Sequence, residues 1–253
     1  MFITCEFCKQ PLTKKQLLKG NRFCSKSCSI SYRNKPAKDP NIFDIDNEEI
    51  KYYLLGMIYA DGNLSNDEKR ITLSLTQKDL IEKLYPYMCD ATRRKIYEYD
   101  PKNTKTHNRS YTLLNTNKDC IKQLKDFGMT PNNSLTKNFP MLPENQMHYL
   151  LRGIFDADGS VYIASRMRGH KYLGVSFTSG SQSFSYGLKD FLEKLGLHPT
   201  LVLDSRRKDS EYPTYYVKLN RKIEIQAFAD YIYKNASIKI TYKFERFYDK
   251  NIV

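Results

Sequence analysis

Alternating apolar and polar residues predict several β-strands in this chain of 253 residues. In residues 70–77, RITLSLTQ, every second side chain is apolar, and Thr72 and Ser74 lie between them. A period of two places one face of a strand on the core and the other in solvent. Further strands are predicted at 95–100, 110–117, 160–165, 173–178, 200–205 and 214–220.

Apolar residues three and four apart predict six longer helices between these strands. They span 45–62, 78–88, 118–128, 142–159, 186–197 and 223–234. At the start of the first, Asp46 is the expected cap, and Glu48 and Glu49 fall in the first turn, where acidic side chains favour the helix dipole. Pro143 stands where the fourth can begin.

The predicted elements recur in the same order in two halves, each αββαββα, over residues 46–142 and 143–253. Antiparallel hairpins with one polar face and one helix-covered face define an α+β fold. We therefore expect two similar repeats, preceded by a linker at 35–45, KPAKDPNIFDI, which contains two prolines.

A nine-residue motif ends the first helix of each half. It reads LLGMIYADG at 54–62 and LRGIFDADG at 151–159. Gly56 with Ala60, and Gly153 with Ala157, lie four apart on one helix face, where small side chains let two backbones approach closely. Since glycine inside a helix costs about 1 kcal/mol relative to alanine, we expect the two motif helices to pack side by side.

That packing brings two acidic residues together, Asp61 and Asp158, at helix ends that already carry partial negative charge. Divalent cations remove this conflict, and carboxylate oxygens at a site that meets phosphate favour Mg²⁺. Such ions activate water and stabilise charge on attacking and leaving oxygens. Gly62 and Gly159 follow, and we expect them to let the chain turn out of each helix.

The net charge indicates a polyanionic partner. Lys and Arg total 41 against 28 Asp and Glu, which gives +13, and release of counterions from phosphates drives binding of such a chain to nucleic acid. A membrane surface would also attract it, but no apolar run is long enough to span a bilayer. The start, MFITCEFCKQ, lacks a secretory pattern, so an intracellular location with reduced thiols is expected. The four histidines show no matched spacing.

Four cysteines at the N-terminus have the spacing of a zinc site. Cys5 and Cys8 form one pair, Cys24 and Cys28 another, and 15 residues separate the pairs. We expect one structural Zn²⁺ that supplies the folding energy of a module over residues 1–34; accidental clustering or disulfides are the alternatives. The basic residues of this segment indicate a phosphate-contacting finger or a solvated charged face: Lys9, Lys14, Lys15, Lys19, Arg22, Lys26, Arg33, Lys35 and Lys38.

The two nonapeptides resemble those of LAGLIDADG homing endonucleases of the single-chain, two-repeat type, and the likeness extends from residue 46 to the C-terminus. The resemblance implies a pseudo-twofold protein whose two saddle-shaped antiparallel sheets lie along the DNA major groove. It also implies double-strand cleavage of a long, asymmetric site. Asp61 and Asp158 match the family's metal ligands, for two or three Mg²⁺ at the catalytic centre.

The resemblance extends to other positions near the motifs. The family often has an acid two residues before the metal ligand; Asp156 matches it, whereas the first copy has Tyr59, and neither is the essential ligand. A polar residue near the start of the second helix is also typical. Gln77 matches it in the first half, and Ser179 or Gln182 in the second.

The family commonly has a basic residue beyond each repeat's last helix that helps to organise active-site water. In the first half Asn133 stands where lysine is frequent, and Lys137 is the nearest substitute. In the second half Lys239 and Lys243 are available, and we prefer Lys243. Phosphate contact or simple solvation remains an equal alternative for these lysines.

A two-stranded ribbon fits the major groove and points every second side chain at the bases. The base-reading candidates are Thr72, Ser74, Lys218 and Asn220. Basic hairpin tips are expected to contact phosphates, which position a protein without reading sequence. These residues are Lys102, Lys105, Arg109, Arg166, Arg168, Arg206, Arg207 and Lys208.

The sequence therefore predicts a monomeric, Mg²⁺-dependent, site-specific endonuclease for double-stranded DNA. The expected setting is the cytoplasm of a bacterial or phage-infected cell, or an organelle. One alternative is a maturase that binds intron RNA on the same fold. Another is a DNA-binding regulator with a decayed site, against which the presence of both Asp61 and Asp158 argues.

Overall fold

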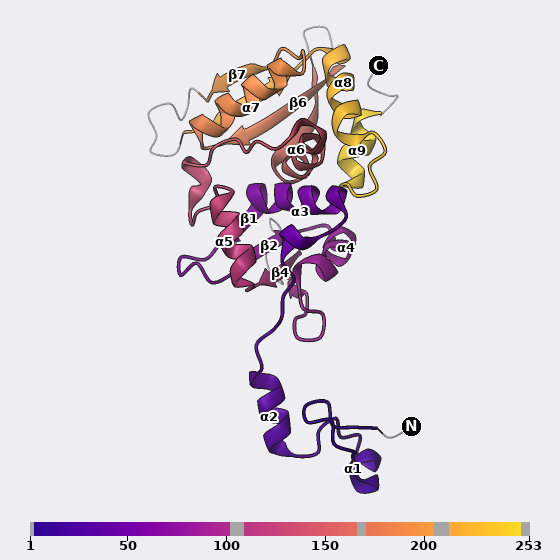
Figure 1. Cartoon of the computed structure of the whole chain (residues 1–253). Coiled ribbons are helices and arrows are strands. Elements are labelled where there is room, and N and C mark those ends of the chain that lie inside the picture. The colour runs from indigo at the N-terminus through magenta and orange to yellow at the C-terminus, as the bar shows by residue number, and fades with distance from the viewer. Residues whose placement is uncertain (1–2, 102–108, 166–170, 205–212, 249–253) are drawn as a thin grey trace. The chain divides into compact units, whose positions relative to one another are not determined.

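The computed structural model describes residues 3–101, 109–165, 171–204 and 213–248. The chain divides into two compact units, Met1–Lys38 and Asp39–Val253, which are considered separately below (Figure 1).

The first unit has short helices and little apolar core. Helix α1 spans Lys14–Leu18 and α2 spans Lys26–Asn34. Thr13 caps α1 through a reciprocal pair of hydrogen bonds with Gln16, and the Ser25 hydroxyl accepts from the backbone N–H of Cys28 at 3.0 Å to begin α2. Within this unit the buried apolar side chains are Cys5 and Leu12, so packing alone contributes little to its stability.

The second unit begins at Asp39, which is anchored by polar contacts. Its carboxylate pairs with Arg94 at 2.8 Å and accepts from the backbone N–H of Thr116 at 2.8 Å. Ile42, at the start of the 3₁₀ helix η1 (Ile42–Asp44), is fully buried in the core of this unit.

The first repeat runs through three helices and one antiparallel sheet. Its elements are α3 (Glu48–Asp61), β1 (Gly62–Leu64), β2 (Ile71–Leu75), α4 (Lys78–Met88), β3 (Tyr97–Tyr99), β4 (Ser110–Asn115) and α5 (Lys118–Asp126). The strand order is β1-β2-β4-β3. A 3₁₀ helix, η2 (Asn133–Leu135), precedes the second repeat.

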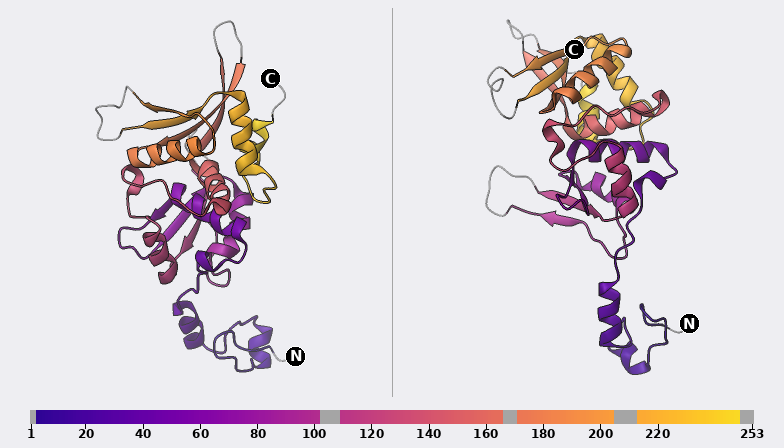
Figure 2. Two further views of the ribbon diagram at one scale, coloured as in Figure 1. Left: turned by 45° about the horizontal axis from the view of Figure 1, so that its top comes forward. Right: turned by 60° about the vertical axis from the view of Figure 1, so that its left-hand side comes forward.

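The second repeat has the same order and one further helix. Its elements are α6 (Glu144–Asp158), β5 (Gly159–Ser165), β6 (Lys171–Ser179), α7 (Gln182–Lys194), β7 (Thr200–Leu203), β8 (Tyr215–Leu219), α8 (Lys222–Tyr233) and α9 (Thr241–Phe247). The order β5-β6-β8-β7 matches that of the first sheet (Figure 2). The predicted α+β fold of two αββαββα repeats is confirmed.

Each sheet buries one face against its helices. In β2, Ile71 and Leu73 are fully buried, whereas Thr72 and Ser74 point away from the core. In the second sheet, Val217 and Leu219 of β8 are buried in the same way. Helices α6, α7 and α8 all contact strands of this sheet. The open face of each sheet therefore carries the polar half of the alternating pattern.

Two helix starts differ from the sequence prediction. Helix α3 is capped by Asn47, whose side chain accepts from the backbone N–H of Ile50 at 3.1 Å, so the prediction of Asp46 as the cap is wrong by one residue. Helix α7 begins at Gln182 because the Ser181 hydroxyl accepts from the N–H of Phe184 at 3.2 Å. A side-chain cap thus fixes both starts more closely than the apolar period does.

Helices α3 and α6 pack backbone to backbone. A Cβ atom added to Gly56 would lie 2.3 Å from the carbonyl oxygen of Leu150, and one added to Gly153 would lie 2.2 Å from that of Tyr53. Any side chain at either glycine would force the helices apart. The expected side-by-side packing of the two motif helices is confirmed, and these helices form the centre of the second unit (Figure 1).

In the described part of the chain, no helix has both the length and the apolar character needed to cross a lipid bilayer.

Candidate catalytic and metal centres

The two motif aspartates end their helices at the junction of the repeats. Asp61 is the last residue of α3 and Asp158 the last of α6. Their carboxyl groups are close enough to share a hydrogen bond. Burial in the cleft and the negative charge of Asp158 raise the pKa of Asp61 to about 6, although the nearby ammonium groups of Lys243 and Lys137 oppose this shift. The expected juxtaposition of the two acids is therefore present.

The glycines after the aspartates serve a different purpose from the one expected. Gly62 and Gly159 have extended backbones, with φ of −73° and −76°, rather than the left-handed conformation of a glycine helix stop. A Cβ on Gly62 would lie 2.3 Å from the Ile58 carbonyl oxygen, and one on Gly159 would lie 2.1 Å from the Phe155 ring. Glycine is needed here for space.

A cleft of about 200 Å³ opens beside Asp61. The first repeat contributes Asp61, Ser74, Thr76 and Gln77, and the second contributes Ala157, Tyr242 and Lys243 among others. The cleft is therefore polar and is built from both repeats.

Gln77 lies at the start of α4 with its side chain available to the cleft. It occupies the N-cap position, yet its side chain makes no capping hydrogen bond. The corresponding N-cap of α7 is Ser181, rather than the proposed Ser179 or Gln182. Ser181 is buried, and its hydroxyl donates to the carbonyl oxygen of Lys137 at 2.6 Å. The helix-start residues of the two repeats thus differ in role. The Gln77 amide lies near Asp61, whereas the Ser181 hydroxyl holds the backbone of Lys137.

Lys137 reaches from the first repeat to the aspartate of the second. Its side chain is buried, and its Nζ lies 3.5 Å from Oδ2 of Asp158. The ring of Phe184 lies 5.0 Å from the ammonium. Lys137 therefore places a positive charge beside the carboxylate of Asp158.

Lys243 caps the C-terminal end of α6 near the two acids. Its Nζ donates to the carbonyl oxygens of Asp156 and Gly159, both at 2.6 Å, and approaches those of Phe155 and Ala157. Burial lowers the pKa of Lys243, and Asp156, Asp61 and Asp158 oppose that shift.

The alternative lysine of this segment makes different contacts. Lys239 donates to the Ala236 carbonyl oxygen at 2.8 Å, and its ammonium lies 4.7 Å from the ring of Phe244. Of these two lysines, Lys243 is the one that contacts the end of α6 and acts on the pKa of Asp61.

Asp156 joins several segments of the second unit through buried hydrogen bonds. It is buried, and its Oδ2 accepts from the Tyr53 hydroxyl and from the N–H of Ile240, each at 2.8 Å; the Tyr233 hydroxyl donates to the other oxygen. Tyr59, at the matching place in α3, donates to the carbonyl oxygen of Asn138 at 2.6 Å. Both residues hold the segment that follows the last helix of a repeat.

The open face of the first sheet carries a groove of about 340 Å³. Thr72 lines it, and the neighbouring Ser74 hydrogen-bonds Thr112 across the strands at 2.7 Å. Residues that sequence reasoning missed also line it: Asn63, Ser65, Arg70, Tyr97, Thr112 and Leu114. Asn63 pairs with Thr72, and Tyr97 with Thr112. This strand register was the missing signal.

On the open face of the second sheet, Lys218 and Asn220 lie beside tyrosines. The Lys218 ammonium lies 4.9 Å from the ring of Tyr216, and the Tyr162 hydroxyl approaches Asn220 at 3.4 Å. The ring of Tyr162 covers Gly174, where a Cβ would lie 2.4 Å from the ring. Aromatic rings therefore flank both candidate base-reading side chains.

Arg109 is engaged by neighbouring acids, since it pairs with Glu98 at 3.2 Å and with Asp100 at 2.6 Å. A phosphate would compete with these carboxylates for the guanidinium. The other predicted phosphate contacts, Lys102, Lys105, Arg166, Arg168, Arg206, Arg207 and Lys208, lie outside the described residues.

The four N-terminal cysteines converge. All four Sγ atoms lie within 4.8 Å of one another, with 3.5 Å between Cys8 and Cys24 and 3.4 Å between Cys24 and Cys28. Four thiolates around one zinc ion stand about 3.8 Å apart, given a Zn–S distance of about 2.3 Å. Burial would raise the pKa of Cys5, but backbone N–H groups at Cys8, Cys24 and Phe7 lower it to about 6. The donor set therefore fits zinc.

Comparison with known proteins places the second unit in a fold class. Residues 145–233 match the model of the LAGLIDADG-like domain. The homing endonuclease I-WcaI, bound to its DNA recognition sequence, matches with a TM-score of 0.55 and 14% identity over 91% of this chain and 97% of that one. I-GzeII, in complex with its DNA target, matches with a TM-score of 0.52 and 12% identity over 78% and 87%.

A further match is weaker in structure. Full-length DUF199/WhiA from Thermatoga maritima matches with a TM-score of 0.48 and 15% identity, over 84% of this chain and 65% of that one. No curated protein sequence matches. The match to the LAGLIDADG-like domain falls within the second repeat, and the chain has the LAGLIDADG fold seen in I-WcaI and I-GzeII.

Proposed function

We propose that this chain is a Mg²⁺-dependent endonuclease that cuts both strands of a long, asymmetric DNA site. The observation that carries the proposal is the pair Asp61 and Asp158, one from each repeat, with carboxyl groups close enough to share a hydrogen bond. A DNA-binding regulator has no need for two adjacent carboxylates whose repulsion opposes ionisation.

The pair fits Mg²⁺ by the chemistry of its donors. Asp61 and Asp158 offer adjacent oxygen ligands, and Asp61 lines an open polar cleft. Burial and the charge of Asp158 raise the pKa of Asp61, and a divalent cation relieves the repulsion between the two carboxylates. When bound there, Mg²⁺ supplies charge stabilisation for the attacking and leaving oxygens of a phosphodiester.

The surrounding side chains would hold charge and orient water. Lys137 places a positive charge 3.5 Å from Asp158. Lys243 offsets the negative end of α6 beneath the pair. Gln77 lines the cleft, and its side-chain amide makes no capping hydrogen bond to α4. This amide is suited to orient water beside Asp61.

The open sheet faces supply the DNA contacts in this proposal. Thr72 and Ser74 on the first sheet, and Lys218 and Asn220 on the second, point away from the core. Two of the similar structures, I-WcaI and I-GzeII, contain their DNA targets. By analogy we expect these four side chains to read bases in the major groove of duplex DNA, with the chain acting as a monomer.

Cleavage of a plasmid library with Mg²⁺ tests the proposal. We expect wild type to linearise plasmids that carry its site. Asp61→Asn and Asp158→Asn should each lose at least about 10³-fold in rate, because charge stabilisation by the metal contributes several kcal/mol. Asp190→Asn, at an exposed acid on α7, is the matched control. Undiminished cleavage by the double variant would overturn the proposal.

Splicing assays separate the maturase alternative. A maturase does not need Mg²⁺ bound by Asp61 and Asp158 to assist splicing of its intron RNA. Both asparagine variants would therefore retain that activity. An endonuclease would leave splicing unchanged in all variants and lose only cleavage.

A further inference from the structure

The zinc module carries most of the chain's excess charge. Residues 1–38 contain nine of the 41 lysines and arginines but one acidic residue, Glu6, which leaves +8 of the total +13. The module has little apolar core, and its excess of positive charge does not contribute to its folding. This concentration of charge indicates that the module binds a polyanion.

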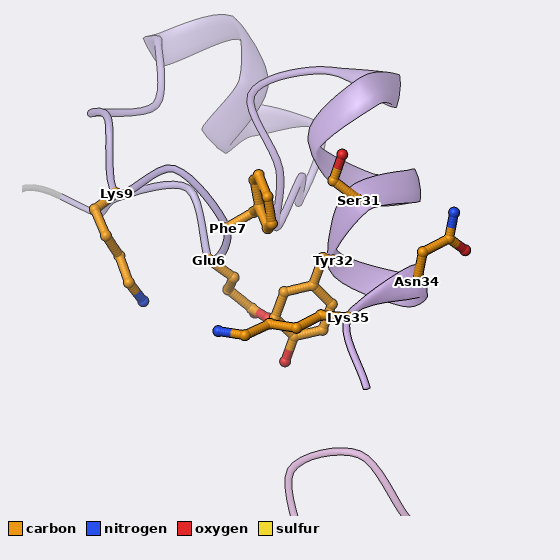
Figure 3. A pocket seen from close by; sticks show the side chains of 7 residues that line it. All are labelled: Glu6, Phe7, Lys9, Ser31, Tyr32, Asn34 and Lys35. Carbon is orange, nitrogen blue, oxygen red and sulfur yellow. The ribbon is translucent and has the colours of Figure 1, made fainter. Parts of the chain in front are cut away.

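A groove of about 750 Å³ lies within this unit, between the loop of the first cysteine pair and α2. Phe7 and Tyr32 face into it, and the side chains of Lys9 and Lys35 extend along its mouth from its two sides (Figure 3). Phe7 is 41% exposed, a large fraction for an aromatic side chain held between two clustered cysteines.

The groove is held in shape by its surroundings. Phe7 stands between Cys5 and Cys8, so the cysteine cluster fixes its backbone, and Lys9 follows in a left-handed conformation with φ of 61°. The ring of Tyr32 packs against Phe23 with centroids 5.0 Å apart. An aromatic platform with little freedom loses little entropy when a ligand stacks on it.

The acid in the groove does not oppose an anion. The Glu6 carboxylate accepts two hydrogen bonds from Arg22, at 2.6 Å and 2.7 Å, and this ion pair lowers the pKa of Glu6. With Glu6 paired, the ammonium groups of Lys9 and Lys35 set the charge at the mouth of the groove.

We propose that this groove binds an unpaired nucleotide of single-stranded DNA, at a site separate from the cleavage centre. The base stacks on Phe7, and Lys9 and Lys35 contact the flanking phosphates. Lysines beside an exposed ring are the combination by which proteins hold single strands, because every base offers a π-face. In a duplex those faces are covered by neighbouring base pairs, so Phe7 would gain nothing.

The choice of DNA rests on the proposed function. A module joined to a DNA-cleaving unit meets unpaired nucleotides of the same DNA at a high effective concentration. RNA presents the same stacking chemistry and is therefore an arm of the test.

Fluorescence anisotropy of the zinc-loaded full chain, without Mg²⁺, tests the proposal. The probes are a single strand of about 15 thymidines, its duplex with adenosines, and the matching uridine strand. We expect Phe7→Leu, which keeps apolar bulk but removes the ring, to weaken binding of the thymidine strand by about tenfold while leaving duplex binding unchanged. Lys9→Gln and Lys35→Gln should each weaken it and reduce the salt slope by about 0.7.

Controls separate stacking from misfolding and from bulk charge. Leu18→Ala, at a side chain that is 89% exposed on α1, and Lys83→Gln, on α4, should bind like wild type. Each variant must hold one zinc ion, which shows that the cysteine cluster is intact. If Phe7→Leu with its zinc binds the single strand like wild type, the site is wrong. If the uridine strand binds tenfold more tightly, the assignment to DNA is wrong.

The binding readout is independent of cleavage. A chain that cuts no plasmid but loses single-strand affinity in Phe7→Leu would refute the proposed function and support this site. Cleavage of the plasmid together with unaltered single-strand binding by Phe7→Leu would support the proposed function and refute this site.

Discussion

At the scale of single residues, the candidate catalytic centre is an electrostatic compromise. Asp61 and Asp158 repel each other, and two buried lysines limit that repulsion from different directions. Lys137 comes from the first repeat and meets the aspartate of the second, so the first repeat supplies part of the second repeat's half of the centre.

The raised pKa of Asp61 predicts a pH dependence. Since the folded value is about 6 and the ordinary value is 3.8, the folded state binds more protons between these limits, and metal-free stability should fall as pH rises through this range. Thermal unfolding without Mg²⁺ from pH 4 to 7 should show this fall in wild type but less of it in Asp61→Asn. An equal fall in both proteins would contradict the prediction.

The same titration governs activity. Protonated Asp61 is a poor metal ligand, so cleavage should fall below pH 6, by about tenfold per pH unit at limiting Mg²⁺. Added Mg²⁺ should move the midpoint to lower pH, because the metal competes with the proton. If the pH dependence of the cleavage rate does not change with Mg²⁺ concentration, Asp61 is not a metal ligand.

The sequence was informative about some of these residues and silent about others. Asp61 and Asp158 stand out because each is the eighth residue of a similar nine-residue pattern. Ser181 and Tyr97 could not be found in this way, because their places depend on a helix start and a strand register that side-chain caps and hairpin geometry decide. Lys243 was selected by resemblance, yet its contacts with four carbonyl oxygens at the end of α6 follow only from three-dimensional packing.

At the scale of elements, the order and type of helices and strands in the second unit follow from periodicity alone. Two apolar periods, 2 and 3.6, identify every strand and helix of the repeats except the short β1 and the terminal α9. Strand β1 has three residues and α9 has seven, too few to show a period.

The contact between α3 and α6 predicts a large cost for one methyl group. In Gly153→Ala the new Cβ would meet the Tyr53 carbonyl oxygen at 2.2 Å, so the helices must separate. We expect a loss of about 1–3 kcal/mol in the free energy of unfolding, despite alanine's better helix propensity. Urea unfolding measures it, with Lys83→Ala on the exposed face of α4 as control. Equal midpoints for the two variants would refute the backbone contact.

At the scale of the whole molecule, the chain combines two units with different sources of stability. The second has a continuous apolar core that includes both motif helices. Among the described residues of the first, Leu12 is the one buried apolar side chain outside the cluster of four thiols, so the folding of this unit should depend on the metal.

Removal of zinc should therefore affect one unit only. A chelator should release about one zinc ion per chain and make residues 1–38 sensitive to protease, while thermal unfolding of the rest remains. Elemental analysis and limited proteolysis check this. Cys24→Ser should behave like the chelated protein, and Cys120→Ser, at a buried cysteine outside the cluster, should keep its zinc. Less than half an equivalent of zinc in wild type would reject the site.

The glycine contact between α3 and α6 also bears on how such a chain can diverge. Sheet faces and loops of the two repeats are free to change independently. At Gly56 and Gly153 neither copy can gain a side chain unless its partner retreats, and no smaller residue exists. Divergence after a duplication would thus be slowest along this helix contact, where five of the nine motif residues are identical in the two repeats.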